Sequence, residues 1–110
     1  MNVHIIPTIL VQSEQEAKER LRALGKAASW IQWDILDHSL TSTACWYDAD
    51  IVKAWEIHPS IELHLMVNDP EPIIQAWRRM KKVKRVIWHV EAPIDHQHLI
   101  RQCRRWKLEV

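Results

Sequence analysis

Hydrophobic runs and amphipathic stretches alternate along this chain of 110 residues. Four short runs rich in apolar and β-branched residues predict buried strands over residues 3–10, 30–36, 61–67 and 85–90. Apolar residues recur at helical spacing between these runs, over residues 13–24, 48–57, 70–80 and 95–106, and residues 107–110 predict the start of a fifth strand. Strands that alternate with helices in this way predict a parallel sheet with right-handed crossovers.

Residues that start and stop helices stand at the boundaries of these stretches. Ser13 and Glu16 have the spacing of a capping box, and Gly25 is placed to end that helix. The pair His58-Pro59 breaks the next stretch. Asn68-Asp69-Pro70 offers a capping side chain and a proline for the first turn of the third helix. We predict one α/β domain over residues 1–110, a (βα)4 unit with a fifth-strand stub, which is either half of a TIM barrel or a small open sheet.

The two edges of such a sheet carry a further prediction. An isolated half barrel exposes two strand edges and the inner face of its sheet, which promotes association. We therefore expect either a homo-oligomer, such as a dimer of half barrels, or a second half supplied by other residues.

Composition narrows the choice of function. The chain has one glycine, which excludes a glycine-built phosphate loop. Cys45 and Cys103 lack the spacing of metal ligands and fit the thiols of a reducing compartment. No apolar run approaches the roughly 20 residues of a membrane span, and the first residues lack the pattern of a signal peptide. We expect a cytoplasmic protein without a membrane partner.

Charge is unevenly distributed, although the formal net charge is only +1. Residues 1–69 carry 5 basic and 10 acidic side chains, whereas residues 70–110 carry 10 basic and 4 acidic ones. The basic run 78–85 is interpreted as a solvated helix end and turn, because no nucleic-acid motif accompanies it. The opposite charges of the two halves favour pairing between the N-terminal half of one copy and the C-terminal half of another.

Polar residues share one face of the predicted sheet, since every second residue of a strand points to the same side. The opposite face carries large apolar residues suited to packing against helices. The residues of the polar face are Thr8, Gln32, Asp34, Glu62, His64, Met66, Ile87 and His89, with Glu91 just beyond them. Buried there, the ionisable groups must be paired, hydrated or bound to a metal.

Asp34 and His64 stand out because they lie at the carboxyl ends of adjacent strands, where parallel folds bind ligands. A carboxylate and an imidazole suit Zn, Fe, Mn or Co, although two ligands are too few for a closed site. Asp37, at the end of the second strand, has the alternative role of capping the next helix. His89 and Glu91, after the fourth strand, are secondary candidates for site residues. His96-Gln97-His98 is a secondary candidate for metal ligands.

With these residues the chain resembles the N-terminal half of a ribulose-phosphate 3-epimerase, along nearly its whole length. Ile6-Pro7-Thr8-Ile9-Leu10 is similar to the family's opening Pro-Ser-Ile-Leu strand. The string from Trp30 to Asp37 resembles W-I-H-x-D-V-M-D, and residues 62–67 resemble D-V-H-L-M-V. Asn68-Asp69-Pro70 matches the following turn, and His89-Val90-Glu91 resembles H-x-E.

The resemblance implies a TIM barrel that interconverts D-ribulose 5-phosphate and D-xylulose 5-phosphate through an enediolate. Two Asp side chains move the C3 proton on opposite faces, and a divalent metal stabilises the oxyanion. By position, Asp34 corresponds to the first acid–base Asp and a metal ligand, and His64 to a ligand His. Thr8 corresponds to the Ser that contacts substrate, and Met66 to a Met that lines the metal site.

Three departures from the family pattern bear on activity. Gln32 stands where the other metal His belongs, and an amide is a poorer ligand. His38 replaces the glycine after Asp37. The second catalytic Asp and the phosphate-binding loops belong to the family's C-terminal half, which these 110 residues do not include. Loss of one of two opposed bases is expected to abolish efficient epimerisation.

Three hypotheses follow. In the first, this is an epimerase-family polypeptide, incomplete or inactive by itself, that retains part of a metal-dependent isomerase site for a sugar phosphate. In the second, it is a non-catalytic half-barrel module that self-associates into a closed barrel. A weaker third hypothesis is phosphate or nucleic-acid binding through the basic C-terminal half.

Overall fold

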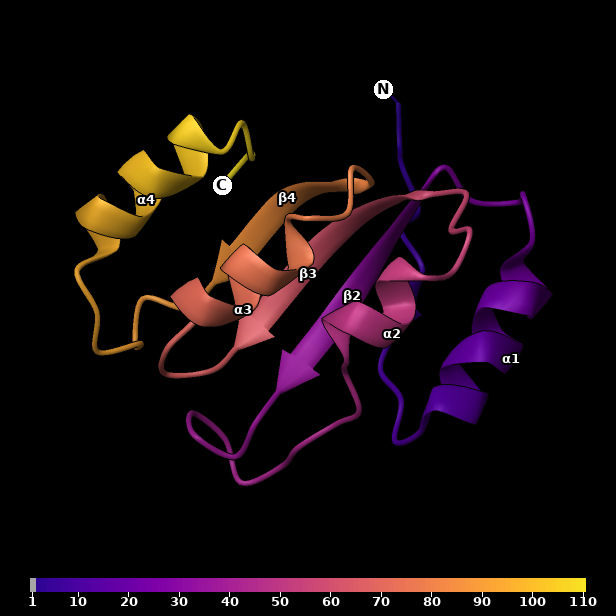
Figure 1. Cartoon of the computed structure of the whole chain (residues 1–110), viewed down its shortest axis with the longest axis horizontal. Coiled ribbons are helices and arrows are strands. Elements are labelled where there is room, and N and C mark those ends of the chain that lie inside the picture. The colour runs from indigo at the N-terminus through magenta and orange to yellow at the C-terminus, as the bar shows by residue number, and fades with distance from the viewer. Residues whose placement is uncertain (1) are drawn as a thin grey trace.

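A four-stranded parallel sheet forms the centre of the computed structural model, which describes residues 2–110 (Figure 1). The strands lie in the order β1-β2-β3-β4, so each neighbours the next along the chain. The elements are β1 (Thr8–Ile9), α1 (Glu14–Leu24), β2 (Trp30–Leu36), α2 (Ala49–Lys53), β3 (Ser60–Met66), α3 (Glu71–Trp77), β4 (Val83–Trp88) and α4 (His96–Arg105). The predicted α/β class and the alternation of strands and helices are confirmed. The sheet is not closed, and its arrangement is consistent with half of a TIM barrel.

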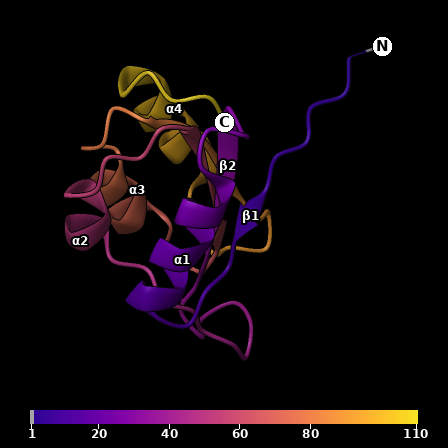
Figure 2. The same cartoon turned by 90° about the vertical axis from the view of Figure 1, so that its right-hand side faces the viewer.

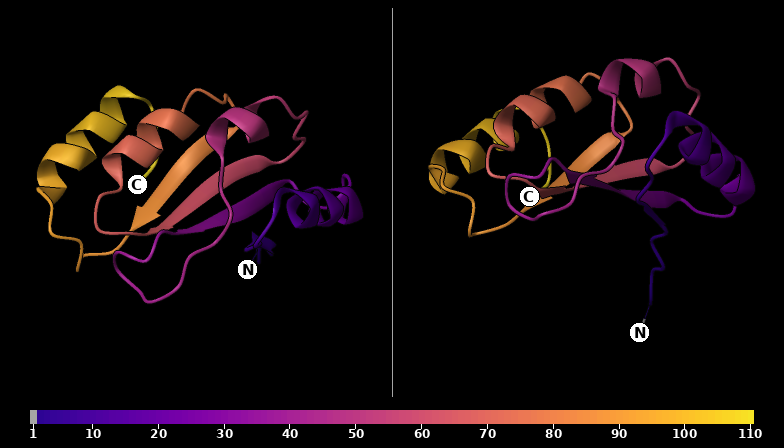
Figure 3. Two further views of the ribbon diagram at one scale, coloured as in Figure 1. Left: turned by 60° about the horizontal axis from the view of Figure 1, so that its bottom comes forward. Right: turned by 90° about the horizontal axis from the view of Figure 1, so that it is seen from below.

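All four helices lie on one face of this sheet, and the other face is left open by the described residues (Figures 2 and 3). The chain before β1 extends away from the sheet instead of covering it (Figure 2). The helix-facing side chains of β2 and β3 are fully buried: Ile31, Trp33, Ile35, Ile61, Leu63 and Leu65. Burial of such side chains stabilises the fold by about 1.5–3 kcal/mol each. The core is therefore one-sided, between the sheet and the helices.

The centre of the sheet is its best-paired part. β2 and β3 align over seven residue pairs, from Trp30 and Ser60 to Leu36 and Met66. Trp33 from β2 packs against Trp77 from α3, with 5.1 Å between ring centroids. This packing holds β2 against α3. It therefore helps to position the side chains on the opposite, open face of the strand.

The predicted helix ends are confirmed at α1. The Ser13 hydroxyl accepts a hydrogen bond from the Glu16 N–H, and Gly25 ends the helix at a φ of 52°. The prediction for α3 was wrong in one respect. Its N-cap is Pro70, and no capping side chain accepts a hydrogen bond there, so Asn68 and Asp69 belong to the preceding turn.

Several predicted boundaries also differ from the structure. The first strand, expected over residues 3–10, is only Thr8–Ile9, the two residues that pair in register with β2. The helix expected over residues 48–57 is the single turn Ala49–Lys53, with Asp48 as its cap. β4 begins and ends two residues earlier than predicted, at Val83 and Trp88, so His89 follows the strand. The fifth strand is reduced to one parallel bridge between Arg85 and Glu109.

None of the helices found among residues 2–110 has the length and apolar character needed to cross a membrane.

Candidate functional site

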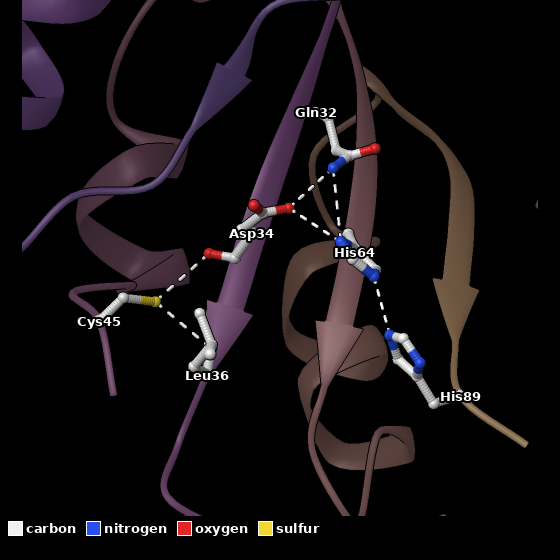
Figure 4. Close-up of polar contacts among 6 residues, drawn as sticks. All are labelled: Gln32, Asp34, Leu36, Cys45, His64 and His89. Carbon is white, nitrogen blue, oxygen red and sulfur yellow. Dashed lines mark hydrogen bonds and ion pairs between the residues drawn. The ribbon is translucent and has the colours of Figure 1, made fainter. Parts of the chain in front are cut away.

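A polar cluster lies on the open face of the sheet, toward the carboxyl ends of β2 and β3 (Figure 4). Asp34 and His64 are direct register partners on these strands, as their positions in the sequence predicted. Gln32 lies two residues earlier on the same face of β2, and His89 approaches from the segment after β4 (Figure 4). The predicted co-location of Asp34 and His64 is therefore confirmed.

Asp34 is the most buried polar residue of this cluster, with 9% of its surface exposed. Its Oδ1 accepts hydrogen bonds from Gln32 Nε2 at 2.8 Å and from His64 Nδ1 at 3.0 Å. Its Oδ2 has no hydrogen-bond partner among residues 2–110 and is accessible to solvent. One oxygen of the carboxylate is thus held in place, and the other is free toward the open face.

The contacts of His64 determine its tautomer. An ionised carboxylate only accepts hydrogen bonds, so His64 Nδ1 carries the proton that it shares with Asp34. The Nε2 of a neutral His64 is then an acceptor, and it lies 2.8 Å from His89 Nε2. His89 therefore donates its Nε2–H to His64. Gln32 Nε2 is 3.4 Å from the same Nδ1, and its better acceptor is the carboxylate.

The result is a continuous chain of hydrogen bonds from Gln32 through Asp34 and His64 to His89. It ends near Glu91, whose Oε2 lies 3.9 Å from His89 Nδ1. Glu91 is largely exposed, so this last pair contributes little. His89 was a lesser candidate in the sequence, and its direct contact with His64 was not predicted.

A second polar layer lies on the same face, nearer the amino ends of the strands, and its central residue, Arg85, was not predicted as part of a site. Arg85 Nη1 donates to Glu62 Oε2 at 2.7 Å, and Arg85 Nε donates to Glu109 Oε2 at 2.9 Å. The guanidinium also lies over the ring of Trp30, 4.5 Å from its centroid. These two carboxylates raise the pKa of Arg85, with Glu62 as the larger cause. Arg85 therefore neutralises Glu62, whose residue is only 5% exposed.

The structure places the remaining predicted residues outside this hydrogen-bonded chain. Thr8 is exposed beside Gln32 on the edge strand, and Met66 is half-buried at the end of β3. Asp37 Oδ1 accepts a hydrogen bond from the Ser39 N–H at 3.0 Å. The Ser39 hydroxyl in turn accepts one from the Asn68 N–H at 2.8 Å. Asp37 therefore orders the loop after β2, and its alternative role as the cap of the next helix is wrong, because Asp48 caps α2.

Neither the cysteine near the cluster nor the basic run adds a reactive group to it. Cys45 Sγ contacts the Asp34 carbonyl oxygen and the Leu36 N–H, each at 3.3 Å. Burial raises the pKa of this thiol, which disfavours the thiolate. Within the basic run, Arg78 lies over the ring of Trp106 and Lys82 donates to the His58 carbonyl oxygen.

The cluster lies on an open surface and not in an enclosed cavity. A hollow of about 480 Å³ exists elsewhere, between α1 and residues 55–59. That hollow adjoins the segments that precede β2 and β3, at the amino ends of the strands. In parallel β/α folds, ligand chemistry is found at the carboxyl ends, so the polar cluster is the better candidate.

The ligand set implied by the family resemblance does not fit a metal in this arrangement. Gln32 directs its amide nitrogen at Asp34, and an amide nitrogen with two protons offers no lone pair to a cation. The Nδ1 of His64 is occupied by Asp34. Residues 2–110 contain no group of three or more His, Cys, Asp or Glu side chains arranged to hold a metal. Gln32, Asp34 and His64 are instead satisfied by each other.

Comparison with known proteins supports the resemblance seen in the sequence. The model of the ribulose-phosphate 3 epimerase family matches residues 4–109, which is almost the whole chain. A search of curated proteins found no match.

Proposed function

The chain belongs to the ribulose-phosphate 3-epimerase family, and on this premise we propose that Asp34 is a base for proton removal from a ketopentose phosphate. The single observation that supports this role is the free Oδ2 of Asp34. A general base needs a lone pair within reach of the substrate proton, and this oxygen faces the open side of the sheet. Gln32 and His64 occupy the other oxygen and orient the carboxylate.

The proposed step is abstraction of the C3 proton. The C3–H bond breaks, its electron pair moves toward the adjacent carbonyl to give an enediolate, and the proton passes to Asp34 Oδ2. The two hydrogen bonds at Oδ1 hold the carboxylate in place, so the direction of Oδ2 is set before the reaction. Thr8 and Met66 border the place where the sugar would lie and are proposed to contact it.

A single base can return a proton only to the face of the enediolate from which it removed one. Glu62, the other buried carboxylate of the open face, is neutralised by Arg85 and is not available as a second base. The residues described here therefore support exchange of the C3 proton with solvent, whereas inversion at C3 needs a second acid on the opposite face.

Proton exchange in deuterated buffer tests this proposal. We expect the C3 proton signal of D-ribulose 5-phosphate to decay faster with the protein than in buffer, and Asp34→Asn to remove that acceleration. Asp50→Asn, on the exposed surface of α2, is the matched control and should keep it. Absence of exchange with correctly folded protein, for both this substrate and D-xylulose 5-phosphate, would reject the catalytic role.

We also propose a second function, self-association of the open sheet with a second copy of this chain. The observation that favours it is apolar exposure beside both edges of the sheet. Val3 and Ile5 are 78% and 86% exposed before β1, and Val90 is 81% exposed after β4. In a two-fold closed barrel, the acidic N-terminal half of one copy adjoins the basic C-terminal half of the other, which adds electrostatic complementarity.

The mass in solution tests this second proposal. We expect about twice the 13.1 kDa of one chain and a shift toward monomer on Ile5→Lys or Val90→Lys. Gln15→Lys, on the exposed side of α1, is the control and should leave the mass unchanged. A monomeric wild-type protein at micromolar concentration would reject the association.

A further inference from the structure

We infer that this chain binds a small polyphosphate in a basic hollow at the amino ends of its strands. The ligand class is a chain of two or more linked phosphates, either free or attached to a nucleoside. This site does not depend on the proposed catalysis, because the hollow and the polar cluster lie at opposite ends of the sheet and share no residue.

Three basic segments meet at this end of the sheet. The strands are parallel and lie in sequential order, so the segments that precede β2, β3 and β4 are neighbours. Each of these segments contributes at least one basic side chain to the lining of the hollow. The basic side chains are those of Lys26, Lys53, Arg79, Lys81 and Lys82. Residues far apart in the sequence are thus brought to one place by the topology.

The hollow between these segments has the size of a small-molecule site. Its volume is about 660 Å³, within the range of roughly 300–1,000 Å³ typical of ligand pockets. Lys82 joins two of its walls, because its Nζ donates to the His58 carbonyl oxygen at 2.8 Å. The Lys82 carbonyl oxygen in turn accepts a hydrogen bond from the Ile61 N–H at 2.7 Å. The contact between the segments before β3 and β4 is therefore part of the fold.

The hollow concentrates positive charge that the rest of the chain lacks. Its lining carries five basic side chains and one acidic one, Glu56, which gives a formal charge of +4. Because the whole chain carries only +1, the remaining residues together carry −3. None of the five basic groups forms an ion pair with a carboxylate among residues 2–110. A hollow lined by one sign of charge raises the local concentration of the opposite ion.

The ends of the helices account for only part of this charge. The C-terminus of a helix carries partial negative charge, which favours a cation in its last turn. Lys53 has that position in α2. No basic residue lies in the last turn of α3, and Lys81 and Lys82 come after its end. These two cations therefore have no counter-charge in the fold, and an anionic ligand would supply one.

A polyphosphate fits this arrangement better than a single phosphate. Lysine binds phosphate as a point charge, so cations from three segments can contact successive phosphates of one chain. The hollow of about 480 Å³ beside α1 adjoins this one, since both are lined by Lys26 and Trp55. Its wall includes the apolar Leu21 and Leu24. This second hollow offers a place for the base of a nucleotide, whereas a free phosphate chain would use the basic hollow alone.

Calorimetry without sugar or divalent metal tests the inference, with tripolyphosphate and ATP as separate probes. We expect both to bind the wild-type chain. Lys26→Gln/Lys81→Gln should weaken binding by about 2–30-fold, because two exposed ion pairs with phosphate are lost. Both side chains are exposed, so the fold should be unaffected. Arg101→Gln/Arg104→Gln, on the exposed surface of α4, removes the same charge elsewhere and is the matched control.

The two probes distinguish the two sources of the phosphate chain. Tighter binding of ATP than of tripolyphosphate assigns the site to nucleotides, whereas equal affinity assigns it to the phosphate chain alone. Backbone amide NMR locates the bound probe independently of affinity. Shifts should gather in the segments 53–59 and 79–82, and Asp34→Asn should bind both probes like the wild type.

Four results would overturn the inference. They are no binding of either probe at millimolar concentration, equal weakening by the control double variant, amide shifts confined to the carboxyl ends of the strands, and binding of a single-stranded oligonucleotide alone. Since no sugar is present, none of these results bears on whether Asp34 acts as a base.

Discussion

Replacement of Arg85 by methionine should show how strongly the sheet depends on the ion pair beneath the cluster. The variant keeps an apolar stem but removes the 2.7 Å contact with Glu62, whose side chain is 7% exposed. Two unit charges at that distance interact by about 6 kcal/mol at an effective dielectric constant of 20, and desolvation offsets most of this. Removal of one partner from a fully buried pair costs about 3–5 kcal/mol. Because 33% of the Arg85 side chain is exposed, we expect a smaller loss of about 2–3 kcal/mol at pH 8.

A second substitution distinguishes an unpaired charge from a simple packing defect. Glu62→Gln removes the buried charge and nearly keeps the shape of the side chain. The cost of Arg85→Met should therefore shrink toward about 1 kcal/mol in the Glu62→Gln background. Urea unfolding at pH 8 measures the cost in both backgrounds. Glu109→Gln is the control, since that carboxylate is 66% exposed and its pair with Arg85 should contribute less than about 1 kcal/mol. A cost for Arg85→Met that is the same with and without the Glu62 charge would refute the reasoning.

Three further predictions concern the backbone and the buried thiol. Gly25→Ala should destabilise the fold by about 1–2 kcal/mol in urea unfolding. The cause is the backbone at φ 52°, because a Cβ there would meet only the Arg22 carbonyl oxygen at 3.9 Å. His38→Gly should stabilise by up to about 1 kcal/mol, because His38 has a φ of 69°, and an unchanged midpoint would contradict this. Burial raises the pKa of Cys103 to about 11, so its alkylation should be negligible in folded protein at pH 8 and rapid in urea. The neutral thiol should also make the fold lose stability as the pH rises from about 9 to about 11, and a flat profile over that range would contradict the assignment.

The elements that could be predicted from the sequence are those in which hydrophobic residues follow one clear periodicity. The second strand was predicted with its observed bounds, because its alternate residues are large and apolar and pack against helices. The fourth strand was displaced by two residues, since Lys84 interrupts the apolar pattern and separated Val83, which is 4% exposed, from the predicted strand. The first strand was predicted too long, because apolar character alone does not supply the strand partner that residues 3–6 would need.

The same distinction applies to the candidate site. Parallel strands in sequential order place residues at equivalent positions side by side, so Asp34 and His64 could be paired from the sequence. The orientation of the Gln32 side-chain amide could not be predicted, because the sequence does not show whether its nitrogen or its oxygen faces Asp34. Contact between His64 and His89 depends on where β4 ends and how the next segment turns, and the sequence marks neither sharply. The pairing of Arg85 with Glu62 was not predicted, because Arg85 lies in a run of basic residues that otherwise resembles a solvated turn.

The shortness of β1 has a consequence for the order in which the molecule opens. Two residue pairs join β1 to β2, against seven between β2 and β3. Amide hydrogens of β1 should therefore exchange through local fraying, long before those of the central strands, which open only with global unfolding. Thr8, one of the proposed sugar contacts, lies on this loosely held strand. A ligand that binds against β1 would therefore have to immobilise this strand. Its binding would be detected as slower amide hydrogen exchange at Thr8 and Ile9, even where its affinity is modest.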